Sequence, residues 1–106
     1  MKDLLDRAAA LSTSDLDELI AELGKLRATK LPEVTYDYGH GKVVGAIVNP
    51  AYRTDPDPLG SVLGLRHPGF GWCWFLIPPN ERENLLRLWT IQKETHLPPL
   101  PPNKLN

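Results

Sequence analysis

The chain has 106 residues, with 12 basic and 13 acidic side chains and a formal net charge of −1. This length fits one domain and excludes two separate hydrophobic cores. The balanced charge gives no electrostatic reason to expect nucleic acid or an anionic membrane as the partner. Because 42% of the residues are apolar, the composition also argues against disorder. We therefore predict one folded domain over residues 1–96 and a proline-rich tail over residues 97–106.

Cysteine content and apolar runs indicate the compartment. Cys73 is the only cysteine, which excludes an intramolecular disulfide. Charges in the first seven residues interrupt the apolar stretch that a signal peptide needs. The longest apolar run, Trp72 to Ile77, is too short to cross a bilayer. We expect a cytoplasmic protein of a bacterium or of a phage-infected cell.

Two helices are predicted at the N-terminus. The first covers residues 2–10, where leucines and alanines form one apolar stripe. The second is expected to begin after Ser12, a good N-cap with Asp15 three residues on, and to end before Pro32. Its apolar residues recur every three or four positions, as on an amphipathic helix: Leu16, Leu19, Ile20, Leu23 and Leu26.

Beyond the second helix the period of the apolar residues changes to two, which predicts strands. Four segments follow this pattern: residues 34–38, 42–48, 61–66 and 70–77. The first two would form a hairpin around residues 39–41, and the last two would be joined by a turn at residues 67–69. Prolines and glycines make residues 49–60 a predicted loop. Such short connections favour an antiparallel meander.

The C-terminal part is predicted to contain one more helix. Asn80 is expected to cap it, with Glu83 at the capping-box position. Leu97 to Pro102 should adopt polyproline II. The predicted fold is thus α+β, with two N-terminal helices, a meander of about four strands, one C-terminal helix and a polyproline tail.

The aromatic strand around Cys73 is the most distinctive segment. Alternation points one set of side chains to one face: Phe70, Trp72, Trp74 and Leu76. The other set points to the opposite face: Gly71, Cys73, Phe75 and Ile77. Both faces are then apolar. One interpretation is a central strand covered on both faces by its own chain, with Cys73 buried and unreactive. The other is a surface for a partner, because aromatic side chains supply much of the energy of interfaces.

We favour a non-catalytic interaction module, such as a regulator, inhibitor or accessory subunit, that binds another protein or a second copy of itself. The proline-rich tail belongs to this surface because prolines stack on indole rings. The expected contact residues lie on the aromatic strand, in the 49–60 loop and in the tail: Trp72, Trp74, Tyr52, Arg53, Leu97, Pro98, Pro99, Leu100, Pro101 and Pro102.

Two alternatives come from other residues. A basic patch for nucleic acid would combine five residues: Lys25, Arg27, Lys30, Arg53 and Arg66. A small enzyme would have its site near the 49–60 loop, with His67 and either Asp55 or Asp57 as an acid–base pair. The three histidines lack the spacing of metal ligands, and no cofactor motif is present, so we expect neither a metal nor a cofactor.

Overall fold

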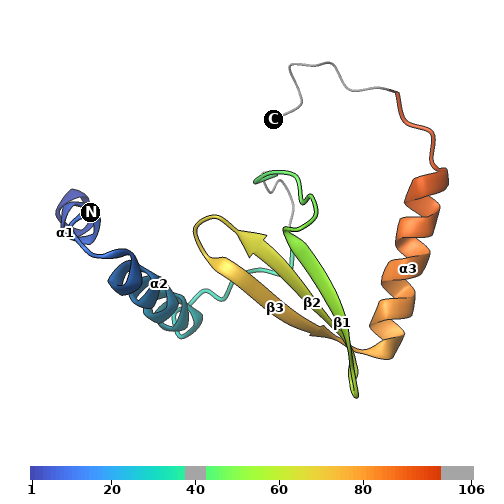
Figure 1. The fold of residues 1–106 in the computed structure, drawn as a ribbon, viewed down its shortest axis with the longest axis horizontal. Helices are drawn as coiled ribbons and strands as arrows, with labels where there is room; N and C mark the ends of the chain where they lie inside the picture. The colour runs from blue at the N-terminus through green and yellow to red at the C-terminus, as the bar shows by residue number, and fades with distance from the viewer. Residues whose placement is uncertain (38–42, 99–106) are drawn as a thin grey trace. The chain divides into compact units, whose positions relative to one another are not determined.

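The structure, a computed structural model, describes residues 1–37 and 43–98. The chain divides into two compact units, Met1–Lys42 and Val43–Asn106. The described residues form three helices and one antiparallel sheet of three strands, so the α+β class is confirmed (Figure 1).

The first unit contains helices α1 (Lys2–Ala9) and α2 (Thr13–Ala28). Both lie where the apolar periodicity predicts them. The Ser12 side chain accepts a hydrogen bond of 3.1 Å from the backbone N–H of Asp15, so the predicted N-cap is confirmed. Lys25 and Arg27 lie in the last turn of α2, where positive charge is favourable to the helix dipole.

The second unit contains strands β1 (Tyr52–Asp57), β2 (Gly60–His67) and β3 (Gly71–Ile77), in the order β1-β2-β3. Both pairs are antiparallel. The β2–β3 hairpin follows the sequence prediction closely. The turn between β2 and β3 covers residues 68–70 and not the predicted 67–69. Gly71, the residue after the turn, has a φ of 74°, a left-handed conformation that favours glycine. Phe70 therefore belongs to this turn and not to the strand.

The prediction of a first hairpin is wrong in the described residues. Residues 34–37 and 43–48 form no strand despite their alternating pattern, and the predicted turn at residues 39–41 lies outside the described residues. The third strand comes instead from the predicted loop, as β1. Strand formation depends on a pairing partner more than on intrinsic preference, and β1 gains that partner through a two-residue turn to β2.

Helix α3 (Pro79–Glu94) begins before the predicted cap. Pro78 occupies the N-cap position, and Asn80 makes no capping hydrogen bond because it already lies in the first turn. Pro79 is the first residue of the helix. Proline suits this position, since its fixed φ matches the helix and the N–H that it lacks would have no partner in the first turn. After α3, Leu97 and Pro98 belong to no helix or strand, and the rest of the predicted polyproline tail lies outside the described residues.

No large apolar side chain in the described ranges is buried. The only buried residues there are two glycines of β2, Gly60 and Gly64. None of the helices in those ranges has the length and apolar character needed to span a bilayer. Residues 43–98 therefore leave many large apolar side chains of the sheet and of α3 exposed.

Candidate protein-binding surface

Strand register divides the side chains of the sheet between two faces, because residues directly opposite each other point the same way. Trp74 lies opposite Gly64, and Gly64 lies opposite Arg53. We call this side the tryptophan face, and its residues are Arg53, Asp55, Asp57, Gly60, Val62, Gly64, Arg66, Trp72, Trp74 and Leu76. The other side, called the helix face, consists of Tyr52, Thr54, Pro56, Ser61, Leu63, Leu65, His67, Gly71, Cys73, Phe75 and Ile77.

Two tryptophans dominate the tryptophan face. The rings of Trp72 and Trp74 are stacked, with centroids 5.5 Å apart and an angle of 19° between their planes. Gly64 lies beneath the second ring, since a Cβ atom at Gly64 would fall 2.6 Å from Cε3 of Trp74. The two side chains nevertheless remain 42% and 51% exposed. The result is an apolar platform, held in place from below by a glycine and open to solvent above.

The charges around this platform are balanced. The guanidinium Nε of Arg53 lies 2.9 Å from a carboxylate oxygen of Asp55, so this ion pair neutralises one arginine. Asp57 lies on the same face and accepts a hydrogen bond of 2.9 Å from the backbone N–H of Leu59. Arg66 lies opposite Trp72 at the other end of the sheet. Two arginines and two aspartates leave the face without the excess positive charge that attracts phosphate.

Helix α3 packs on the opposite side of the sheet, the helix face. Its Arg82 donates a hydrogen bond of 3.0 Å from Nη1 to Oγ of Ser61. Next to this contact, α3 and the sheet form an apolar groove of about 350 Å³. The groove is lined by Thr54, Ser61, Leu63, Ile77, Arg82, Glu83, Leu85, Leu86 and Trp89. The helix therefore covers part of one face, and within residues 43–98 no helix packs on the tryptophan face.

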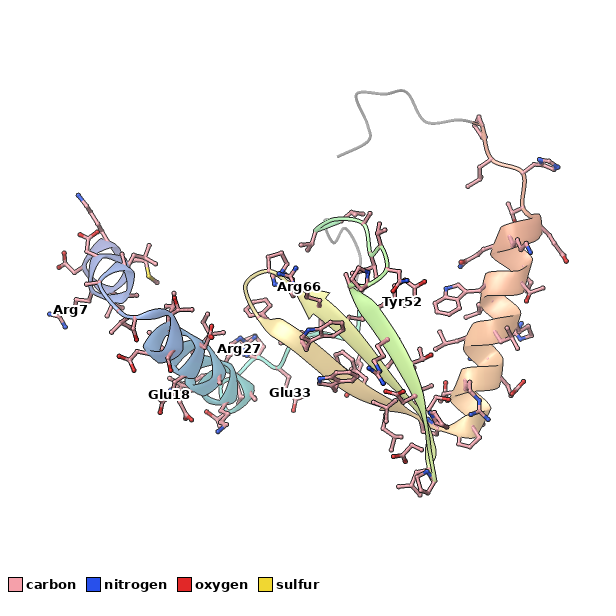
Figure 2. The ribbon with its side chains drawn as sticks, viewed as in Figure 1. Arg7, Glu18, Arg27, Glu33, Tyr52 and Arg66 are labelled. Carbon is pink, nitrogen blue, oxygen red and sulfur yellow. The ribbon has the colours of Figure 1, made fainter. Side chains whose placement is uncertain are left out.

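The structure brings together only some of the predicted contact residues. Trp72, Trp74 and Arg53 share the tryptophan face, as expected for one surface. Tyr52 does not join them, because it is adjacent to Arg53 in β1 and so points to the helix face (Figure 2). Leu97 is 79% exposed beyond α3, and Pro98 beside it is also exposed. Residues 99–102 of the predicted surface lie outside the described residues.

The five basic residues of the nucleic-acid alternative belong to different units. Lys25 and Arg27 lie in α2 and Lys30 follows it, whereas Arg53 lies in β1 and Arg66 in β2. Figure 2 labels Arg27 and Arg66. Some are already engaged locally. Lys25 pairs with Glu22 at 3.2 Å, and Nη1 of Arg27 donates to the carbonyl oxygen of Lys30 at 3.4 Å. These contacts are those of a helix terminus within the first unit.

The predicted acid–base pair is not assembled. His67 points to the helix face, whereas Asp55 and Asp57 point to the tryptophan face. Asp55 lies opposite Val62, five residues from His67 along β2, which corresponds to about 16 Å. The Nδ1 atom of His67 has another role, because it accepts hydrogen bonds from the backbone N–H groups of Gly69 and Phe70 at 2.9 and 3.1 Å.

Cys73 is half-buried, so its expected burial is only partly realised, and β3 is an edge strand rather than a covered central one. Its thiol lies 3.9 Å from the carbonyl oxygen of Gly71.

In residues 1–37 and 43–98, no three histidine, cysteine, aspartate or glutamate side chains are grouped so that they could share a metal ion.

Sequence reasoning missed Gly64, which forms the floor of the platform. The available signal was an isolated glycine inside a predicted strand, which often marks the close approach of another group. Sequence reasoning also missed the apolar groove between α3 and the sheet, because the position of α3 on the sheet depends on tertiary packing.

The chain matches no family model, no curated protein and no solved structure.

Proposed function

We propose that the chain is a non-catalytic module that binds another protein through its tryptophan face. The observation that carries this proposal is the exposure of three large apolar side chains on one side of the sheet: Trp72, Trp74 and Leu76. Burying one such side chain contributes about 1.5–3 kcal/mol. A surface with three of them side by side is costly in water and favourable in an interface.

The composition of the face supports a protein partner over a polyanion. Tryptophan and arginine are the residues most enriched among those that dominate binding energy, and a polar rim usually surrounds them. Here Arg53, Asp55 and Arg66 border the platform, and their charges are balanced by Asp57. A regulator, inhibitor or accessory subunit acting in the cytoplasm is the role that such a small binding surface fits.

Photo-crosslinking in the native cell tests the proposal. A photoreactive phenylalanine at Arg66 lies beside Trp72 and should form an adduct with one protein partner. The same group at Ile91 of α3 serves as the comparison, because the helix lies on the other face. Mass spectrometry identifies the adduct. When the crosslinking is repeated in a lysate of these cells, the yield should not change between low and moderate salt, whereas a nucleic-acid partner would be lost steeply over that range.

The decisive variant combines Trp72→Ala with Trp74→Ala. It should reduce the adduct at Arg66 by at least about tenfold, since tryptophans at the centre of an interface carry much of its energy. Trp89→Ala removes an exposed tryptophan from α3 and is the matched control, expected to keep the adduct. Circular dichroism must show that all variants are folded. A folded double variant that retains the full adduct would disprove the proposal.

A further inference from the structure

We infer that two copies of the chain pair through the free edge of β3, so that two three-stranded sheets join into one. Among residues 43–98, strand β3 is the last strand of the sheet and pairs only with β2 (Figure 1). An unpaired edge of this kind is a template for another strand. The pairing uses the backbone of β3, whereas the function proposed above uses the side chains of the tryptophan face. The two proposals can therefore fail separately.

One hydrogen bond shows which backbone groups of β3 face outward. The N–H of Arg66 donates to the carbonyl oxygen of Ala51 at 2.9 Å, so the backbone of Arg66 faces β1. In an antiparallel ladder the two polar groups of a residue point to the same side, and this side alternates along the strand. The pair Arg66–Trp72 is thus not hydrogen-bonded. The residues of β3 with outward N–H and C=O groups are Trp72, Trp74 and Leu76.

The two edges of the sheet differ in their protection. The same alternation directs the backbones of Tyr52, Thr54 and Pro56 outward from β1. Pro56 has no N–H, so the β1 edge lacks a donor in its outer half, as expected for proline on an edge strand. Strand β3 contains neither proline nor any charged residue along its seven positions. Edge strands of natural proteins usually carry proline or charged residues, which prevent pairing with another strand. Strand β1 has both and β3 has neither, so we expect pairing at the β3 edge.

The sequence of β3 suits a second copy of itself. In an antiparallel pair centred on Trp74, this residue lies opposite its equivalent, and Trp72 lies opposite Leu76 of the second copy. Every outward group is then paired, giving about six hydrogen bonds across the twofold axis. Because β3 is uncharged, identical strands meet without the repulsion that like charges opposite each other produce. A symmetric dimer of this kind is the commonest oligomer.

The same register preserves both faces. Residues of equal parity lie opposite each other, so the tryptophan faces of the two copies join on one side of the extended sheet. Cys73 lies opposite Phe75 of the second copy on the helix face. These two positions form non-hydrogen-bonded pairs across the axis, where Cα atoms are about 4.5 Å apart. This separation allows a disulfide, which provides a direct test of the register.

The test uses the purified full chain. Sedimentation at micromolar concentration should give the mass of a dimer, and Phe75→Cys should form a covalent dimer with Cys73 under oxidising conditions, as seen on a non-reducing gel. Within one chain these two positions are about 6.6 Å apart along the strand, too far for the close Cβ approach of a disulfide. Leu76→Cys places a thiol on the other face and is the matched control, expected to stay uncrosslinked.

A charge reversal at the same positions tests the interface without altering Trp72 or Trp74. Cys73→Lys with Phe75→Lys places like charges opposite each other across the axis, whereas Cys73→Lys with Phe75→Glu places opposite charges there. The first variant should dissociate with a Kd at least about tenfold above that of the second. A monomeric wild type, equal crosslinking in both cysteine variants, or equal Kd values in two folded charge variants would each overturn the inference.

Discussion

The indole ring of Trp74 lies directly over Gly64, on the neighbouring strand. A Cβ atom at Gly64 would lie 2.6 Å from Cε3 and 2.7 Å from Cη2 of that ring, closer than any carbon contact allows. The two residues form a non-hydrogen-bonded pair, in which side chains of neighbouring strands approach most closely. The glycine thus determines where the ring lies, and this ring in turn stacks on Trp72.

Gly64→Ala should therefore displace Trp74 and reduce the free energy of unfolding by about 1–3 kcal/mol, the usual cost of extra volume at a packed position. Urea unfolding followed by circular dichroism measures the loss. Gly45→Ala is the control, because a Cβ atom there meets nothing within 4 Å. Equal midpoints for the two variants would show that the ring does not depend on the glycine.

Substitution by alanine should have opposite effects on the free energy of unfolding at two other glycines. Gly24 lies inside α2, and Gly71 follows the β2–β3 turn; a Cβ atom at either position meets open space. Gly24→Ala should stabilise the helix by about 0.5–1 kcal/mol, because alanine loses less backbone entropy there. Gly71→Ala should destabilise by about 1–2 kcal/mol, since its φ of 74° is left-handed. Thermal unfolding by far-UV circular dichroism compares them, and a shift of the same sign in both would contradict this explanation.

His67 should be replaceable by asparagine but not by alanine. Its Nδ1 accepts the N–H groups of Gly69 and Phe70, and its ring stacks on Phe70 with centroids 4.5 Å apart. An asparagine side chain also accepts an N–H two residues further along the chain. His67→Ala should cost about 0.5–1.5 kcal/mol per hydrogen bond and speed amide exchange at Gly69. Unchanged exchange in His67→Ala would show that the turn forms without the imidazole.

Arg82 should anchor α3 to the sheet. Arg82→Met keeps the aliphatic stem but removes the hydrogen bond to Ser61, so amide exchange in α3 should become faster. Arg87→Met is the matched control, because Arg87 bonds Asn84 within the same helix at 2.7 Å. The expected loss is about 0.5–1.5 kcal/mol for the first variant. If both variants exchange alike, the contact with Ser61 does not hold the helix.

Features that depend on neighbours in the sequence were predicted well. The cap at Ser12 and the span of α2 follow from local hydrogen bonding and apolar periodicity. The β2–β3 hairpin follows from alternation on either side of a short turn. Alternation along the strand also predicts that Trp72, Trp74 and Leu76 share one face, and the register confirms it.

Features that depend on pairing between segments were not predicted. Residues 52–57 include Asp-Pro-Asp, which is typical of a turn, yet they form β1 because β2 supplies a partner and Pro56 points its nitrogen outward. Residues 34–37 alternate well, yet they pair with no strand of the described residues. The register alone places Arg53, Gly64 and Trp74 in one row across the sheet, since those three residues come from three different strands.

The sequence by itself determined the α+β class, helices α1 and α2, the β2–β3 hairpin and the apolar character of both sides of β3. These depend on residue spacing and local hydrogen bonds. Only the tertiary structure decided that β3 is an edge strand, that α3 lies on the face opposite the tryptophans, and that Gly64 supports Trp74. Strand order and register arise from contacts between distant residues, whose free energy no local pattern records.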